Sequence, residues 1–220
     1  MNIKSLLPSL SISADVFSPS GERVFSFAGP GHSWTRNAYL YLFAALTGCG
    51  GGGVATFGPG YMTSKNIAGV LTNVTTSNLT RGAVTALLGT GLCPSTAIST
   101  MGLVCGSGDT AFSIEDYCLA ALISHGSAAG QLSYGVGALP VLSYVGGVWQ
   151  ASHVRRFTNL SGAEITVKEI GLTFLGGLFG VNYSYLFSRD VLETPIPLGH
   201  LALLELTYNL TYDFSVIDGL

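Results

Sequence analysis

Charged side chains are scarce in this sequence. Asp, Glu, Lys and Arg make up 10% of its 220 residues, against about 25% in an ordinary soluble domain. So few charges cannot comfortably cover the surface of a monomer, and the mean hydropathy of +0.49 agrees with this. We therefore expect a membrane or other protein subunits to cover much of the surface.

Long apolar runs are lacking as well. A membrane-spanning helix needs about 20 predominantly apolar residues, and the longest dense apolar run is Ala38–Leu46. Uncharged stretches such as Gly82–Gly108 are interrupted by Gly, Pro, Ser and Thr. No signal peptide is predicted, because Pro8, Ser9 and Ser11 interrupt any apolar segment near the N-terminus. The sequence therefore favours a protein made in a cytoplasm and buried between subunits.

Basic clusters and metal-binding motifs are missing too. Nine Lys and Arg stand against twelve Asp and Glu, a net charge of −3, which argues against binding to nucleic acid. The cysteines form no C-x-x-C pair and the histidines no H-x-x-x-H pair, so we predict no metal ion and no cofactor. We expect the cysteines to be reduced and buried, as small apolar side chains. These residues are Cys49, Cys93, Cys105 and Cys118, and His32, His125, His153 and His200.

Catalytic signatures are equally absent. The glycines of Gly106–Thr110 resemble a phosphate-binding loop, but the segment lacks the spacing and the lysine of that motif. Two carboxylate pairs, Glu115/Asp116 and Asp190/Glu193, leave a two-carboxylate glycosidase site open. Only two tryptophans are available for the aromatic cleft that such a site usually needs. We therefore predict no catalytic residue.

The arginines are expected to form internal ion pairs and not to bind a ligand. Arg155, Arg156 and Arg189 would pair with Glu164, Glu169 or Asp190. Asp116 is a candidate cap for a helix that begins at Tyr117.

The N-terminal half contains one clear helix. Residues 1–20 are polar and rich in Ser and Pro, which predicts an irregular, extended arm. A short strand is expected at Arg23–Ala28, after a turn at Pro19–Glu22 and before Gly29–His32, which would end it. Ser33 is predicted to cap a helix over residues 34–47, which Gly48 would end. Apolar side chains cover most of this helix, so we expect it to be buried on most sides. The following residues, to about 95, are rich in Gly, Thr, Ser and Asn and predict loops and short strands.

The C-terminal half has the pattern of an antiparallel sheet protein. Val154–Phe157 and Glu164–Leu172 flank a turn with Asn, Ser and Gly, which predicts a β-hairpin. Tyr183–Phe187 and Leu201–Tyr212 are two further strands, separated by prolines that cannot donate to a sheet ladder. Within Glu164–Leu172 the apolar alternation changes phase near Glu169, which indicates either a bulge at Gly171 or a strand buried on both faces. Other strand-like segments are 99–105, 131–134 and 140–150, whereas 114–123 is ambiguous.

These patterns predict a mainly β fold. We expect an antiparallel β-sandwich of the jelly-roll or immunoglobulin-like kind with one N-terminal helix near residues 34–47. Residues 1–95 would supply the arm, the helix and a Gly-rich assembly region, and residues 96–220 the sandwich. One continuous domain is the alternative.

Two blocks of the sequence resemble a known family. They are GLVCGSGDTAFSIEDYCLAALISHGSAAGQLSYG at Gly102–Gly135 and RRFTNLSGAEITVKEIGLTF at Arg155–Phe174, the latter followed by RDVLETPIPL at Arg189–Leu198. Together they resemble a widespread group of tailed-bacteriophage virion proteins. In that group a G-x-G-x-T-A-x-x-x-x-D-x-x-L segment precedes R-x-F-T-N-x-S-G-x-x-I-T-V-x-E-I-G-L and R-D-V-L. The matching positions are Gly106, Gly108, Thr110, Ala111, Asp116, Leu119, Arg155 or Arg156, Phe157, Thr158, Asn159, Ser161, Gly162 and Glu169–Leu172.

The resemblance implies a non-enzymatic structural protein of the virion, made in the cytoplasm of the host bacterium. Such a protein would self-assemble and pack against capsid or tail proteins. The low charge and the high mean hydropathy likewise predict that the purified protein is a trimer or larger, or that it aggregates on its own. It would serve as a capsid decoration or auxiliary protein, or as a neck or tail accessory, without nucleic-acid or membrane partners. A receptor- or glycan-binding module of a tail or head fibre, with a host surface glycan as partner, is the alternative. A polysaccharide hydrolase is a third hypothesis.

Overall fold

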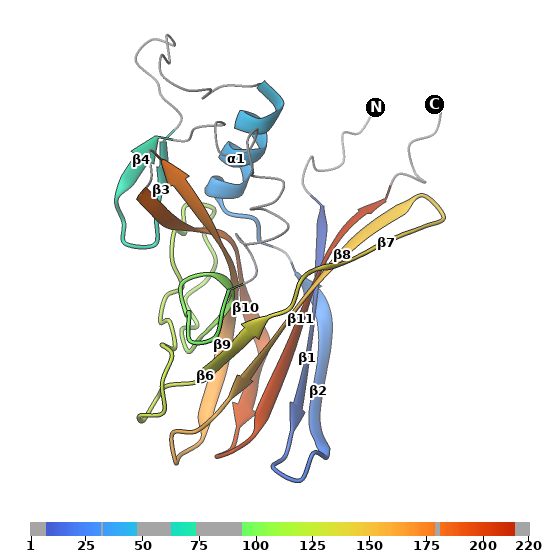
Figure 1. Cartoon of the computed structure of the whole chain (residues 1–220), viewed down its shortest axis with the longest axis vertical. Helices are drawn as coiled ribbons and strands as arrows, with labels where there is room; N and C mark the ends of the chain where they lie inside the picture. The colour runs from blue at the N-terminus through green and yellow to red at the C-terminus, as the bar shows by residue number, and fades with distance from the viewer. Residues whose placement is uncertain (1–7, 32, 48–62, 74–93, 179–180, 214–220) are drawn as a thin grey trace.

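The fold is mainly β, with antiparallel sheets and one helix (Figure 1), as the sequence predicts. The computed structural model describes residues 8–31, 33–47, 63–73, 94–178 and 181–213. Its strands are β1 (Ser9–Phe17), β2 (Arg23–Gly31), β3 (Thr63–Lys65), β4 (Leu71–Asn73), β5 (Gly102–Gly106), β6 (Ser133–Gly137), β7 (Val141–Val145), β8 (Val148–Thr158), β9 (Ile165–Leu178), β10 (Val181–Leu198) and β11 (Leu203–Asp213), and its helix is α1 (Arg36–Thr47).

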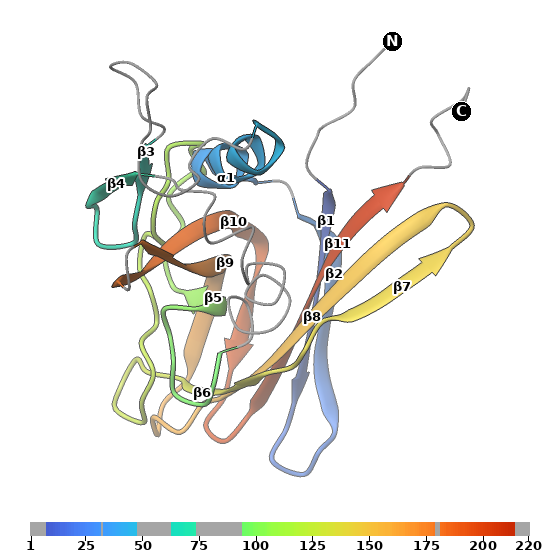
Figure 2. The ribbon, with the colours of Figure 1, turned by 45° about the horizontal axis from the view of Figure 1, so that its top comes forward.

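Two larger sheets lie on either side of one hydrophobic core. The six-stranded sheet has the order β2-β1-β11-β8-β6, and β7 also pairs with β8. The three-stranded sheet has the order β10-β9-β5, and β3 and β4 form a separate pair. The sheets diverge toward the end of the molecule that carries α1, as Figure 2 shows from a second direction. Strands from residues 1–95 and from residues 96–220 therefore share one sheet.

Strand β1 corrects the prediction of an irregular N-terminal arm. Ser9–Phe17 pairs with β11 on one side and with β2 on the other. Leu10, Ile12, Ala14 and Val16 are buried, because alternate residues of a strand point to the same face. The serines between them make the segment polar on average. The alternation of apolar and polar residues is the feature of the sequence that indicates a strand here.

Strand β2 is longer than predicted. It runs through Pro30 to Gly31, although Gly29–Gly31 was expected to end it at Ala28. Because β2 is the edge strand of its sheet, the missing N–H of a proline costs no ladder hydrogen bond there. The preceding turn is formed as expected, with a φ of +84° at Gly21.

Helix α1 begins at Arg36, not at residue 34 after a Ser33 cap. The residues before it are extended along the edge of β10, where the Thr35 N–H donates to the Phe187 carbonyl at 2.8 Å and the Ser33 carbonyl accepts from the Arg189 N–H at 3.0 Å. The helix packs on β10 through Tyr41, whose ring lies 5.4 Å from that of Phe187. Because the residues before the helix pair with β10, the helix begins further along the sequence than predicted.

The predicted hairpin between Val154–Phe157 and Glu164–Leu172 is wrong. β8 pairs with β11, β6 and β7, whereas β9 pairs with β10 and β5. The residues between β8 and β9 are therefore a corner that leads from one sheet to the other. The expected turn chemistry is present, since Gly162 has a φ of +82°. A turn signal alone does not determine whether the flanking strands pair or separate.

Asn159 holds this corner in the core. Its side-chain amide donates to the carbonyls of Ala163 at 2.7 Å and Leu198 at 2.8 Å. Its backbone N–H donates to Ala202 at 3.0 Å, and its carbonyl accepts from Leu201 at 2.7 Å. The corner between β8 and β9 is thereby fastened to the connection between β10 and β11.

Strand β10 passes through both prolines that were expected to separate two strands. Pro195 and Pro197 lie inside Val181–Leu198, on the edge strand of the three-stranded sheet. Its pairing with β9 is irregular between Val191 and Ile196, and again between Leu186 and Ser188. Edge position and bulging both accommodate proline.

Strand β9 is buried on both faces, which explains the phase change near Glu169. Ile170 and Leu172 are buried on one face, and Glu169 and Gly171 are buried on the other. The predicted alternative, a bulge at Gly171, is wrong because the irregular positions belong to the partner strand β10.

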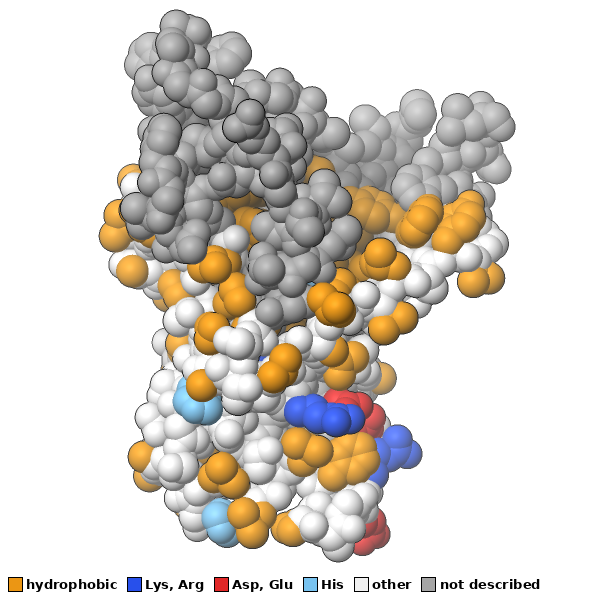
Figure 3. All heavy atoms as spheres, in the orientation of Figure 1, with side chains coloured by type: hydrophobic (Ala, Val, Ile, Leu, Met, Phe, Trp, Pro, Cys, Tyr) orange, Lys and Arg blue, Asp and Glu red, His pale blue; other side chains and the backbone are white. Residues whose placement is uncertain are grey.

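The described surface is poor in charge. Figure 3 shows the blue and red side chains of one face gathered low on the molecule, with apolar side chains above them. The two largest exposed fractions among the described apolar side chains occur near β7, at Val145 (76%) and Leu139 (68%), followed by Val141 of β7 and Leu71 of β4 (66% each). The chain in and around β7 therefore exposes apolar side chains to solvent.

Gly162→Ala should lower the free energy of unfolding by about 1–2 kcal/mol, because an L side chain is strained in the left-handed region. A Cβ at Gly162 would have nothing within 4 Å, so the cost is conformational rather than steric. Gly199→Ala is the matched control, since its Cβ is equally open and its φ is not positive. Urea unfolding of both variants measures the difference, and equal stabilities would contradict the strain argument.

Candidate functional site

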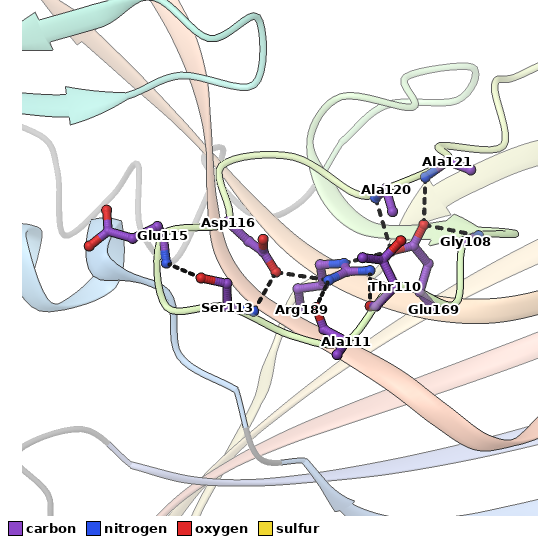
Figure 4. Close-up of polar contacts among 10 residues, drawn as sticks. All are labelled: Gly108, Thr110, Ala111, Ser113, Glu115, Asp116, Ala120, Ala121, Glu169 and Arg189. Carbon is purple, nitrogen blue, oxygen red and sulfur yellow. Dashed lines mark hydrogen bonds and ion pairs between the residues drawn. The ribbon is translucent and has the colours of Figure 1, made fainter.

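The sequence blocks singled out above meet on one face of the three-stranded sheet. Asp190 of β10 contacts Tyr208 of β11, in the opposite sheet. Because neighbouring residues of a strand point to opposite faces, Arg189 points away from the core between the sheets. The segment from Ser107 to Ala121 covers it there, without any helix or strand of its own (Figure 4).

Arg189 and Glu169 form a buried ion pair. Arg189 Nε lies 2.7 Å from Glu169 Oε2, and the two side chains are 2% and 0% exposed. Arg189 Nη1 lies 2.8 Å from Asp116 Oδ2. Burial lowers the pKa of Arg189, but its hydrogen bonds to Glu169 and Asp116 outweigh that effect and the net shift is upward. Arg189 is thus a permanent cation between two carboxylates.

Backbone groups of the segment from Ser107 to Ala121 form further hydrogen bonds with both Arg189 and Glu169. Arg189 Nη2 donates to the Thr110 carbonyl at 2.8 Å. Glu169 Oε1 accepts from the N–H groups of Ala121 at 2.8 Å and Gly108 at 3.2 Å. Buried charges require such partners, because desolvation is otherwise too costly. We call these residues the Arg189 cluster: Gly108, Thr110, Asp116, Ala120, Ala121, Glu169 and Arg189.

The glycines of the segment have a steric role. A Cβ at Gly106 would collide with Glu169 Oε1, and a Cβ at Gly108 would lie 2.6 Å from the same atom. At Gly171 of β9 a Cβ would lie 2.9 Å from Leu119 Cδ2. The glycine-rich segment therefore does bind an anion, but this anion is the protein's own Glu169 carboxylate and not a phosphate.

A second buried cation, Arg155 of β8, has no carboxylate partner among the described residues. Its guanidinium donates to the carbonyls of Ile98 at 2.7 Å, Met101 at 2.9 Å, Leu103 at 2.9 Å and Gly135 at 3.0 Å. The Tyr134 ring lies 4.9 Å from the guanidinium carbon. Burial lowers the pKa of Arg155 to about 10, so it remains charged near neutral pH. It joins the six-stranded sheet to β5.

The predicted partners of the arginines are confirmed only for Arg189 with Glu169. Arg156 pairs with Glu205 at 2.7 Å instead of Glu164 or Asp190, and Arg155 bonds to carbonyls. A signal for the Arg189 cluster was present, because Glu169 lies in an apolar run and a buried carboxylate needs a cation. No pattern in the sequence indicates that backbone carbonyls are the partners of Arg155.

The remaining polar residues considered from sequence are spread over the structure. His125 Nδ1 accepts from the Tyr134 N–H at 3.0 Å, and His200 Nδ1 accepts from the Gly162 N–H at 3.1 Å. Glu115 pairs with Arg36 at 3.0 Å, whereas its neighbour Asp116 pairs with Arg189. The suggested cap of a helix by Asp116 is wrong, since no helix follows it.

Two of the four cysteines lie in the described part of the chain. Cys105 is buried and Cys118 is partly buried, and burial raises the pKa of both thiols. Cys49 and Cys93, like His32, lie outside the described residues. Within the described parts of the chain, no group of three or more His, Cys, Asp or Glu residues is arranged to hold a metal ion.

The arrangement is that of a structural connection. The charged groups of the Arg189 cluster are all engaged with one another or with the backbone, so none stands ready to act as a base or nucleophile. No helix of the described residues reaches the length and apolarity needed to cross a membrane. Comparisons with protein-family models, with curated proteins and with solved structures found no match.

Arg189→Met should lower the free energy of unfolding by about 3–5 kcal/mol, because it leaves the carboxylate of Glu169 buried without its cation. Arg156→Met is the matched control, since the exposed pair with Glu205 contributes about 0–1 kcal/mol. Chemical denaturation followed by tryptophan fluorescence gives both values. Equal losses in the two variants would contradict the role assigned to the Arg189 cluster.

His153 should make the protein less stable in mild acid. Its side chain is 4% exposed, and burial lowers its pKa from 6.5 to about 4. Between these pKa values the unfolded state binds the proton and the folded state does not, so stability falls as the pH falls. The loss amounts to about 2 kcal/mol between pH 7 and pH 5. Urea unfolding at both pH values should show a smaller difference in His153→Leu, and an unchanged difference would contradict this assignment.

Proposed function

We propose that this chain is a non-enzymatic structural protein of a bacteriophage virion, which self-assembles and packs against other virion proteins. One observation carries the proposal. Asp116, Glu169 and Arg189 of the family-like sequence blocks are engaged in contacts with one another and with the backbone, whereas the exposed surface near β7 is apolar and uncharged. A self-assembling structural protein needs a well-packed interior and an exposed surface that can bind further subunits.

The low charge of the whole chain supports the same function. A chain in which 10% of the residues are charged favours association, because charge is what keeps monomers apart in solution. The resemblance to tailed-phage virion proteins supplies the context, either capsid decoration or an accessory of the neck or tail. Several of the motif positions that carry the resemblance lie in the Arg189 cluster (Gly108, Thr110, Asp116 and Glu169) or at the corner between β8 and β9 (Asn159 and Gly162), which fits motifs that maintain a fold.

A receptor- or glycan-binding module is the second candidate function. It is favoured by an exposed aromatic pair on the β7–β8 hairpin, Tyr144 and Trp149, which are 57% and 48% exposed with ring centroids 4.9 Å apart. Exposed rings of this kind can stack on sugars. A glycan array probed with wild-type protein and with Trp149→Ala separates this function from the first, because a pure building block binds no glycan in either form.

Immunogold labelling of purified virions tests the first proposal. An antibody raised against the chain should label intact particles at one constant location, and prior absorption of the antibody with the protein should remove the label. Light scattering at micromolar concentration should show an oligomer. Unlabelled particles together with a stable monomer would overturn the proposal.

A further inference from the structure

The strand β7 and the first half of β8 form a ribbon that extends beyond the three-stranded sheet (Figures 1 and 2). We call residues 141–152 the β7 ribbon. The ribbon contains no charged residue. All five residues of β7 are exposed, although four of them are apolar.

Apolar side chains occur on both faces of the ribbon, and one face is wholly apolar. Leu142 and Tyr144 of β7 stand opposite Ala151 and Trp149 of β8, and these four share the face that continues the core side of the six-stranded sheet. Val141, Val145 and Val148 lie on the other face, together with Ser143, Gln150 and Ser152. A ribbon that only covered a core would be apolar on one side.

The outer edge of β7 has no strand beside it among the described residues, since β7 pairs with β8 alone. Such an edge presents unpaired N–H and C=O groups to another chain. The opposite edge of the same sheet, β2, carries Arg23 and Pro30, which are residues that discourage further pairing. β7 has no Lys, Arg or Pro, so this edge lacks the residues that discourage the addition of another strand.

We propose that β7 pairs antiparallel with β7 of a second copy of this chain, about a two-fold axis at Ser143. The sequence of β7 is Val-Leu-Ser-Tyr-Val, which is symmetric in its polarity about Ser143. In this register Val141 faces the partner copy's valine at 145, and Leu142 faces its tyrosine at 144. Apolar side chains then meet on both faces, as an isologous contact requires, and a slip by one residue would lose this match.

The area of the surface fits a contact between copies. Leu139, Val141, Leu142, Tyr144 and Val145 are each more than half exposed. Together with Trp149 they leave on the order of several hundred Å² of apolar surface, comparable with the ~800 Å² per partner of a standard interface. Monomeric proteins rarely leave a contiguous patch of that size uncovered. The inference rests on the self-assembly in the proposed function and identifies one of its interfaces.

Cross-linking tests the register. Residues directly opposite each other in antiparallel strands have Cα atoms about 4.5–5.5 Å apart, which a disulfide can bridge. Ser143→Cys should therefore give a covalent dimer under mild oxidation, seen on a non-reducing gel and lost with reductant. Ser26→Cys, on the exposed face of β2, is the matched control, and wild-type protein shows the contribution of the native cysteines. Equal dimer yields from all three proteins would overturn the register.

A lysine on the ribbon tests the contact itself. Val145→Lys should reduce the wild-type mass in light scattering to half, because two lysines enter an apolar strand pair. Val24→Lys is the control, since Val24 is 59% exposed on the opposite edge strand, and it should keep the wild-type mass. Circular dichroism verifies that both variants are folded.

The outcomes separate this inference from the proposed function. An oligomer whose mass is unchanged by Val145→Lys overturns the β7 contact and leaves self-assembly intact. A wild-type monomer overturns both. If Val145→Lys keeps its mass but no longer enters particles, the occupant of the ribbon is another virion protein, and the contact between copies is rejected.

Discussion

The ion pair between Arg189 and Glu169 constrains the whole three-stranded side of the molecule. Two charges without water are tolerated only when each finds further partners. Here those partners come from a segment with no helix or strand, whose N–H groups and carbonyls surround the pair. The conformation of that segment, the glycines within it and the close approach to β9 are all consequences of placing a carboxylate in the middle of a buried strand.

The sandwich contains a second buried cation and treats it differently. Arg155 is surrounded by four backbone carbonyls and two aromatic rings. Carbonyl dipoles can hold a guanidinium because its five N–H donors are spread in a plane. One arginine therefore secures the face of the three-stranded sheet from outside, and the other connects the two sheets from within.

Local patterns in the sequence anticipated the fold class and most strands, but not how the strands are arranged. The turn at Asn159–Gly162 was recognisable from its residues, yet the same turn can close a hairpin or lead to another sheet, and only the burial of Asn159 decides between them. β1 was missed because its serines lower the average hydropathy while its alternation remains. In the Arg189 cluster, the pairing of Arg189 with Glu169 was expected. The contacts to Gly108, Ala120 and Ala121 depend on backbone positions brought together over 48–61 residues of chain, which no local pattern encodes.

The bonding of the segment around Gly108 and Ala121 has a consequence for how the molecule fluctuates. Irregular surface segments usually open on their own, at little cost. This one is fastened to a side chain from the central strand of a sheet, so the amides of Gly108, Ala120 and Ala121 become accessible only when they release the carboxylate of Glu169. Opening of this segment is therefore coupled to the buried carboxylate of Glu169 and to its ion pair with Arg189, and the segment is expected to open together with β9 and not on its own.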